Sequence, residues 1–291
     1  MLEGIIVKGY SGFYYVQSGS FLWECSLRGK YRIKDQDFLV GDRVLIKPLN
    51  DSKAVIEKVL TRTNQLIRPP VANVEQVVIV VSLANPDPDL MLLDRILVLA
   101  EHQELKVVIC FNKADLVDEE YQDKHRSLYE SIGYDTLLTS VKTMTGISRL
   151  LDYLKGKISV MTGPSGVGKS SILNAIQPGL ALKTGRVSQK TKRGRHTTRH
   201  VELMGLEAGG FVADTPGFSR LDLPEIKKED LSYFFPEMAE LKTGCRFTSC
   251  LHQTEPGCAV LAAKDKGSVD MGRYENYSYL LNELIRNERR Y

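Results

Sequence analysis

The sequence lacks the features that mark several specialised classes of protein. Its five cysteines among 291 residues are too few for a disulfide-stabilised scaffold. The longest largely apolar stretch, residues 77–84, is less than half as long as a membrane-spanning helix. Lys and Arg total 39 against 36 for Asp and Glu, so the net charge of +3 excludes a strongly cationic, histone-like protein. Local basic patches are still compatible with this balance.

The remaining composition is that of an ordinary globular protein. Hydrophobic residues make up 43% and charged residues 26% of the chain, which argues against long disordered segments. A chain of this length corresponds to about two domains, with room for three small ones. The N-terminus, MLEGIIVKGY, carries an acid at Glu3 and no apolar run before a cleavage site, so we expect no secretory signal. We therefore expect a cytoplasmic protein without membrane contact, and a monomer by default.

Residues 1–68 consist of short β-rich runs separated by turn signals. The runs are GIIVKGYSGFYYVQS, FLWECSLRG, GDRVLIKP and KAVIEKVLTR. Such spacing predicts a small closed or half-closed barrel of the OB type. The segment has eleven Lys and Arg against seven Asp and Glu, so it carries much of the excess positive charge. From this segment alone, a barrel that contacts RNA and a barrel that only packs against the chain are equally compatible.

The pattern changes after Pro69 and Pro70. Residues 74–83 form a continuous apolar run, as expected of a strand buried on both faces of a parallel sheet. Other apolar runs of strand length follow at 106–111, 136–140 and 157–162. These runs alternate with segments of helical spacing, which predicts a doubly wound α/β domain over residues 69–222.

A phosphate-binding loop is the most specific motif in the chain. Residues 163–170 read GPSGVGKS and match the pattern G-x-x-x-x-G-K-[ST] in full, between a strand-like run and a helix-like run. In such a loop the backbone N–H groups and the helix N-terminus surround an anion. Lys169 is expected to reach the β- and γ-phosphates, and the Ser170 hydroxyl to ligate Mg²⁺. The predicted phosphate-binding residues are Gly163, Pro164, Ser165, Gly166, Val167, Gly168, Lys169, Ser170 and Ser171.

A second motif, Asn112-Lys113-Ala114-Asp115, is expected to recognise the base of the bound nucleotide. It follows the apolar run 106–111, and α/β folds bind ligands where their strands end. The Asp115 carboxylate can accept from both N1–H and the 2-amino group of guanine, whereas adenine would leave it buried and unpaired. Ser140 and Lys142 belong to a Thr-Ser-Val-Lys loop that resembles the S-A-K loop behind the guanine of GTPases.

The third nucleotide motif reads Asp214-Thr-Pro-Gly217. After a strand and downstream of the phosphate loop, Asp214 is expected to hold Mg²⁺ and the Gly217 N–H to meet the γ-phosphate. Thr197 and Thr198 are the candidates for the switch threonine that ligates Mg²⁺, with Thr198 slightly favoured. Phe218 stands where many GTPases have the glutamine that orients the attacking water.

An apolar ring cannot hydrogen-bond the nucleophile, so another group must position it or unassisted turnover must be slow. His196 is the nearest polar substitute, and a phosphate or RNA contact is its other interpretation. The predicted catalytic residues are therefore His196, Lys169 and Thr198. Residues 178–201 contain seven Lys and Arg and no acid, which is compatible with a solvated loop or with RNA contact in the GTP state.

These motifs occur in an unusual order. Ordinary GTPases run from phosphate loop through switch threonine and D-x-x-G to N-K-x-D and S-A-K. Here N-K-x-D and S-V-K precede the phosphate loop, while the switch threonine and D-x-x-G follow it. The cyclic order is kept, so the sequence predicts a circularly permuted P-loop GTPase domain. An open α/β sheet with neighbouring termini tolerates this change, because the same contacts form wherever the chain is cut.

Residues 223–291 form a third predicted domain, mostly helical and charged. Within it, the spacing C-x₄-C-x-H-x₅-C places three thiols and one imidazole close together, at Cys245, Cys250, His252 and Cys258. Four such ligands suit tetrahedral Zn²⁺, and a filled shell implies one structural ion. Reduced core cysteines and a redox pair are the alternatives, but the histidine and the neighbouring turn-forming residues favour metal.

Taken together, these features resemble one known family. The permuted order, the N-terminal barrel, GPSGVGKS, RGRHTTRH, DTPGF and the cysteine cluster are similar to the RsgA family of small ribosomal subunit biogenesis GTPases. The resemblance covers essentially the whole chain, with the S-V-K loop as the loosest fit. It implies hydrolysis of GTP to GDP and phosphate, stimulated by the small ribosomal subunit, and a role in late maturation of that subunit and its rRNA in the bacterial cytoplasm.

Two other functions stay open at this point. One is a guanine-nucleotide-dependent switch that binds RNA or protein with negligible turnover, for which Phe218 is the support. The other is a P-loop ATPase or kinase with a small substrate, against which Asn112 and Asp115 argue.

Overall fold

The computed structural model describes the chain apart from residues 11, 28–37, 68, 181–200, 215–221 and 289–291. The predicted site residues His196, Thr197, Thr198 and Gly217 lie outside the described residues, as does Phe218. The chain forms two compact units. The first comprises Met1–Val78, Met144–Thr162 and Gly168–Phe218, and the second comprises Ile79–Thr143, Gly163–Val167 and Ser219–Tyr291.

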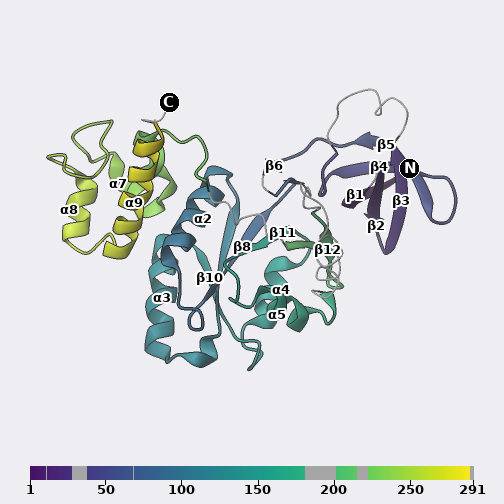
Figure 1. Cartoon of the computed structure of the whole chain (residues 1–291), viewed down its shortest axis with the longest axis horizontal. Helices are drawn as coiled ribbons and strands as arrows, with labels where there is room; N and C mark the ends of the chain where they lie inside the picture. Colours follow the sequence, from purple (N-terminus) through teal and green to yellow (C-terminus); the bar gives the residue numbers. More distant parts are fainter. Residues whose placement is uncertain (11, 28–37, 68, 181–200, 215–221, 289–291) are drawn as a thin grey trace. The chain divides into compact units, whose positions relative to one another are not determined.

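Five N-terminal strands close into a barrel, drawn in purple and blue in Figure 1. They are Leu2–Tyr10 (β1), Phe13–Ser18 (β2), Phe21–Leu27 (β3), Arg43–Pro48 (β4) and Lys53–Val59 (β5), and they pair in the order β1-β2-β3-β5-β4. Because side chains alternate across a strand, one set fills the interior. The seven buried core residues are Ile6, Val16, Cys25, Val44, Ile46, Ala54 and Ile56. The predicted barrel is confirmed, although its first run, residues 4–18, is a hairpin of two strands.

The segment that leaves the barrel is hydrogen-bonded to it. Here Gln65–Leu66 (β6) pairs with Val71–Ala72 (β7). Ala72 N donates to Val40 O at 2.8 Å, and Asn73 Nδ2 donates to Gly41 O at 2.9 Å. Gly41 has a φ of +92°, and a Cβ there would lie 2.1 Å from Ala72 O, so only glycine permits this approach. Residues 72 and 73 are therefore fixed to the barrel.

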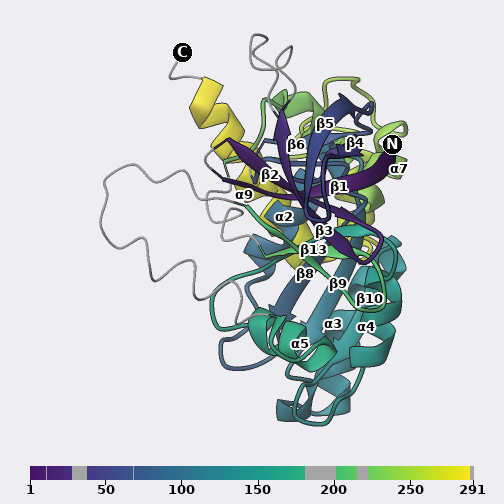
Figure 2. The same cartoon turned by 90° about the vertical axis from the view of Figure 1, so that its right-hand side faces the viewer.

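A six-stranded sheet follows, in the order β10-β9-β8-β11-β13-β12. Its strands are Gln76–Ser82 (β8), Lys106–Asn112 (β9), Asp135–Thr139 (β10), Ile158–Thr162 (β11), Leu203–Gly205 (β12) and Phe211–Asp214 (β13). Figure 2 shows β8, β9 and β10 as neighbouring arrows. All seven residues of β8 are buried, as expected of a strand covered on both faces. Strands β10 and β9 pair in parallel, as do β11 and β13, whereas the edge strand β12 runs antiparallel to β13.

Helices alternate with these strands, which confirms the predicted α/β domain. They are Leu90–His102 (α2), Glu119–Ile132 (α3), Ile147–Leu154 (α4) and Lys169–Ile176 (α5), with a short 3₁₀ turn at Ala114–Leu116 (η1). Side-chain caps fix two of the helix starts: Asp89 accepts from Leu92 N at 2.9 Å, and Asp118 accepts from Tyr121 N at 2.8 Å. The first cap sets where α2 begins, directly after the loop that follows β8.

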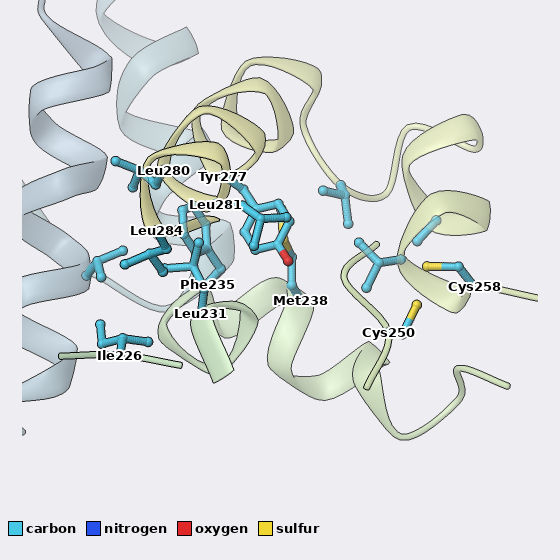
Figure 3. Packing of buried hydrophobic residues seen from close by; sticks show 14 residues of the cluster. Ile226, Leu231, Phe235, Met238, Cys250, Cys258, Tyr277, Leu280, Leu281 and Leu284 are labelled. Carbon is cyan, nitrogen blue, oxygen red and sulfur yellow. The ribbon is translucent and has the colours of Figure 1, made fainter. Parts of the chain in front are cut away.

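The C-terminal module contains one long helix and three short ones. They are Lys228–Phe234 (η3, a 3₁₀ helix), Pro236–Lys242 (α7), Ala259–Asp265 (α8) and Met271–Glu288 (α9). Helix α9 lies alongside α2 in both views (Figures 1 and 2). Figure 3 shows Tyr277, Leu280, Leu281 and Leu284 of α9 packing against Leu231, Phe235 and Met238. None of the helices in the described part of the chain has the length and apolarity needed to span a membrane.

Candidate functional site

The phosphate loop connects β11 to α5. Every residue of β11 is buried, and α5 starts at Lys169, so the loop leaves the carboxyl end of a buried strand. Gly163, Gly166 and Gly168 have positive φ values of 137°, 82° and 101°. A Cβ at Gly163 would lie 2.2 Å from Val80 O of β8, so the loop backbone passes β8 more closely than a residue with a side chain allows.

The first turn of α5 carries the side chains predicted to serve the nucleotide. Ser170 and Ser171 are exposed, as are Ser165 and Gly166 in the loop before the helix, whereas Val167 is buried. An accessible loop of this kind, followed by a helix N-terminus, presents N–H groups and a partial positive charge to an anion. The hydroxyls and the amine of Lys169 are thus placed at the helix end where phosphates bind.

The base-recognition loop, Asn112–Asp115, is tied to the phosphate loop. Asn112 is buried at the end of β9, and its Nδ2 donates to Val167 O at 2.7 Å. Its Oδ1 accepts from Thr139 Oγ1 at 3.0 Å. With both ends of the amide satisfied, Asn112 fixes the distance between the two loops.

Lys113 makes a second link between the same loops. Its backbone is left-handed, with a φ of 61°. The ammonium group donates to Gly166 O at 2.8 Å and to Asn85 O. Lys113 therefore ties the base-recognition loop both to the phosphate loop and to the segment after β8. The contact with Asn85 was not predicted, and the only signal for it is that Asn85 follows a buried strand at its carboxyl end.

Asp115 is oriented by the loop after β10. Ser140 Oγ donates to Asp115 Oδ1 at 2.6 Å, and Thr143 N donates to Ser140 Oγ at 3.2 Å. Lys142 Nζ lies 3.9 Å from Asp115 Oδ2, with its side chain 78% exposed. The hydroxyl of Ser140 holds one carboxylate oxygen, and the exposed amine of Lys142 faces the other. The two loops predicted to recognise guanine are thus in direct contact.

Asp214 ends β13, which pairs in parallel with β11. In this register Asp214 lies opposite Met161, one residue before β11 ends. The D-x-x-G motif and the phosphate loop therefore leave the same edge of the sheet from adjacent strands. The backbone agrees with the Mg²⁺ role predicted for Asp214. The roles predicted for Gly217, Thr197, Thr198 and His196 stay predictions, since these residues lie outside the described ones.

The four predicted metal ligands converge. The ligand atoms of Cys245, Cys250, His252 and Cys258 all lie within 4.8 Å of one another. His252 Nδ1 lies 3.3 Å from Cys258 Sγ and 3.6 Å from Cys245 Sγ, and the last two sulfurs are 3.8 Å apart. A tetrahedral ion with Zn–S bonds of about 2.3 Å places its sulfurs about 3.8 Å apart. Figure 3 shows the sulfurs of Cys250 and Cys258 pointing toward one another. The geometry and the donor set fit zinc.

The loop that carries His252 is held from two sides. Glu255 accepts backbone N–H groups of Leu251, Gln253 and Thr254 at 2.8, 2.8 and 3.0 Å. From α9, Tyr274 Oη donates to His252 O at 2.9 Å, and Tyr277 Oη donates to Leu251 O at 3.0 Å. The ligand loop is thus preorganised by a carboxylate within it and by two tyrosines of the longest helix of the module.

Burial shifts the pKa of two of the predicted metal ligands, His252 and Cys250. It lowers the pKa of His252 to about 4, so that the imidazole is neutral at physiological pH with a lone pair available. Burial also raises the pKa of the Cys250 thiol to about 12. A cation must therefore displace the thiol proton to bind, which couples metal binding to proton release.

A buried charge cluster was not predicted. Arg273 Nη1 donates to Asp94 Oδ1 at 2.6 Å, while its Nε and Nη2 donate to the two oxygens of Glu237 at 2.8 and 2.9 Å. Asp94 is fully buried, and Arg273 is only 2% exposed. The sequence signal for it is Asp94, an acid within the apolar run of helix α2. Nothing in the sequence identifies its partner.

Family models of known proteins match most of the chain. The model described as RsgA GTPase matches residues 59–224, and the model described as RsgA N-terminal domain matches residues 3–56. Curated relatives named small ribosomal subunit biogenesis GTPase RsgA are 53% identical in Moorella thermoacetica and 49% identical in Carboxydothermus hydrogenoformans. Each of these matches covers 99% of both chains.

Solved structures agree with these matches. The fold is similar to YjeQ from Thermotoga maritima, with a TM-score of 0.84, 42% identity and 98% of each chain covered. It is also similar to YloQ, described as a circularly permuted GTPase, with a TM-score of 0.82, 39% identity and coverage of 99% of this chain and 96% of that one. The predicted family resemblance and the predicted permuted fold are confirmed.

Proposed function

The chain belongs to the RsgA family of ribosome-biogenesis GTPases, and from this premise we propose that it docks on the small ribosomal subunit in the GTP state. The subunit stimulates hydrolysis to GDP and phosphate late in its maturation, and hydrolysis releases the protein. The observation that carries the nucleotide half of this proposal is the hydrogen bond from Asn112 Nδ2 to Val167 O, 2.7 Å long. It joins the loop suited to a base to the loop suited to phosphates.

Guanine is selected by Asp115, with Ser140 holding its carboxylate in place. A guanine base offers that carboxylate two donors, whereas adenine offers an acceptor and leaves a desolvated charge. Competition between GTP and ATP for the protein tests this choice. Displacement of bound GTP by equimolar ATP would instead favour a P-loop ATPase or kinase.

Phosphoryl transfer depends mainly on positioning and on stabilising charge. Lys169 and the N–H groups of residues 163–170 stabilise charge on the β- and γ-phosphates, and the Gly217 N–H meets the γ-phosphate. Ser170, Thr197 or Thr198, and Asp214 would hold Mg²⁺, which would supply positive charge against the phosphates. The remaining requirement is a group that orients the attacking water.

His196 is our candidate for that group, since Phe218 cannot hydrogen-bond a nucleophile. We expect His196→Ala to lower subunit-stimulated turnover while GTP affinity changes little. The measurement compares single-turnover hydrolysis on the subunit with nucleotide binding. If affinity falls instead, His196 contacts phosphate or RNA and does not place the water.

Residues 178–201 supply the cationic contact with rRNA, since they hold seven Lys and Arg and no acid. Neutralising RNA phosphates releases counterions, so binding of the GTP state to the subunit weakens steeply as salt rises. A flat salt dependence would show that these residues do not contact RNA phosphates.

The ion in the Cys₃His cluster is one structural Zn²⁺ per chain, and the working form is a cytoplasmic monomer.

One experiment tests the whole proposal against its rival, a guanine-nucleotide switch with negligible turnover, which Phe218 favours. GTP hydrolysis is measured for the protein alone, with small subunits and with large subunits. Strong stimulation by the small subunit only is the expected result. Tight GTP binding without stimulation would support the switch.

A further inference from the structure

Helix α2 begins inside the nucleotide-binding region of the second unit. After β8, Leu83 N donates to Asn112 O at 3.0 Å, and Lys113 Nζ donates to Asn85 O two residues later. A Cβ on Gly166 would lie 3.7 Å from Pro86 Cδ. Residues 83–89 thus contact the base-recognition and phosphate loops. This segment ends at Asp89, the residue that caps the start of α2.

The other side of α2 belongs to the core of the metal-binding module. Val98 is fully buried in the same cluster of residues as Cys250 and Cys258, and Met91 packs against it. Arg95 donates to both carboxylate oxygens of Glu283 on α9, at 2.9 and 2.5 Å. Helix α2 therefore contacts the nucleotide-binding loops at its start. Along its length it packs into the hydrophobic core that includes Cys250 and Cys258.

The buried charge cluster fixes how α2 sits on that core. Asp94, one turn into α2, accepts from Arg273, from Tyr129 Oη at 3.0 Å and from Asn276 Nδ2 at 2.6 Å. An apolar contact tolerates small sliding, but buried charges are satisfied only in one geometry. The cluster joins α2, α3, α7 and α9, so α2 cannot shift on the module without breaking it.

We propose that Arg273 and Asp94 are positioning residues for guanine recognition, through which the zinc-loaded module holds α2 and the loops at its start. The proposal rests on guanine-nucleotide binding as proposed above. Its consequence is linkage: zinc in its site strengthens guanine-nucleotide binding, and the nucleotide strengthens zinc binding by the same factor. The chain would then bind GDP tightly only when its metal site is filled.

The first test uses the wild-type chain. Zinc affinity is measured by competition with a zinc-selective chelator, with and without saturating GDP, and GDP affinity is measured on zinc-loaded and chelator-treated protein. Coupling between sites typically changes affinity by about 5- to 150-fold. We expect both affinities to change in this range and by equal factors. Equal zinc affinity with and without GDP would overturn the proposal.

The second test uses Arg273→Gln, with Lys228→Gln as the matched control. Lys228 pairs with Glu288 at 2.7 Å within the same module, and its side chain is 33% exposed, unlike the buried side chain of Arg273. The probes are GDP and inosine diphosphate, which lacks the 2-amino group that Asp115 accepts. We expect Arg273→Gln to lower GDP affinity about tenfold, within the usual coupling range, and to reduce the preference for GDP over inosine diphosphate.

These outcomes separate positioning from stability. A purely structural role for Arg273 would lower the melting temperature while leaving the GDP-to-inosine-diphosphate ratio unchanged well below it, and that result refutes the proposal. If Arg273→Gln does not fold, the wild-type linkage measurement still decides. Failure of the wild-type chain to bind GDP at all would refute the proposed function instead.

Discussion

The barrel and the C-terminal module are both small, yet they are stabilised by different means. In the barrel, the pairing of five strands closes on itself around a core of seven buried residues. The module has no strands among its described residues, and three of its helices have only seven residues each. Helices this short are unstable alone. We therefore expect the module to depend on a metal ion in its Cys₃His cluster, whereas the described residues of the barrel contain no such group of metal ligands.

The largest expected effect comes from removing the metal. Binding of structural zinc contributes about 10–16 kcal/mol in small zinc domains, and this binding energy is folding energy. We expect Cys258→Ser to abolish amide protection across residues 223–288 while strands β1 to β5 stay protected. Hydrogen exchange read by mass spectrometry measures both regions at once.

The control for that variant is Cys25→Ala, which removes the buried cysteine of the barrel. It should leave zinc content and exchange in the module unchanged. Loss of barrel protection in Cys258→Ser would contradict the comparison, because it would mean that the two regions unfold as one.

A smaller effect is expected from opening a cavity in the barrel. Ile56 is fully buried, and Ile→Ala substitutions in cores cost about 2–5 kcal/mol. We expect Ile56→Ala to destabilise the barrel without changing zinc affinity. Leu280→Ala, an equivalent deletion in the core of the module, should weaken zinc binding, since it destabilises the fold that presents the ligands. Thermal unfolding and chelator competition measure the two effects, and equal zinc affinities in both variants would contradict them.

The smallest effect concerns Glu255. Burial alone would raise the pKa of this carboxyl, but the backbone N–H groups that it accepts hold the pKa below its ordinary value. Glu255→Gln keeps the shape and removes the charge, which should cost the module about 1 kcal/mol.

The sign of its pH dependence follows from the lowered pKa. A group whose pKa falls on folding contributes stability above its unfolded pKa and loses it as pH drops through the folded value. The difference between wild type and Glu255→Gln should therefore stay constant from about pH 8 to about pH 6. Denaturant unfolding measures it, and a difference that shrinks within this range would assign the effect to another group.

The parts of the site that sequence could predict are those in which the chemistry is local. The phosphate loop, Asn112–Asp115 and the C-x₄-C-x-H-x₅-C spacing each place their groups within a few residues, so spacing alone predicts their geometry. The barrel and the alternating α/β pattern were predictable for the same reason, because each strand carries its own alternation or apolar run.

The rest depends on contacts between distant residues. Arg273 lies 179 positions from Asp94, and an acid within an apolar run does not identify its partner. The Asn85 carbonyl that accepts a hydrogen bond from Lys113 is a backbone group, so the identity of the residue does not predict this contact. The hairpin in residues 4–18 was missed because both of its strands are rich in β-forming residues across a short turn.

The glycine at position 41 has a consequence for how this chain can be divided. Its backbone accepts the side chain of Asn73 and lies against Ala72, so residues 71–73 belong physically to the barrel that ends, by strand assignment, at Val59. A truncation at the two prolines would remove residues 71–73 and leave Val40 O and Gly41 O without the donors that Ala72 N and Asn73 Nδ2 supply. Recombination between relatives therefore has to exchange residues 1–75 as one segment. A graft that ended with the last barrel strand would lack the hydrogen bonds from Ala72 and Asn73 to Val40 and Gly41.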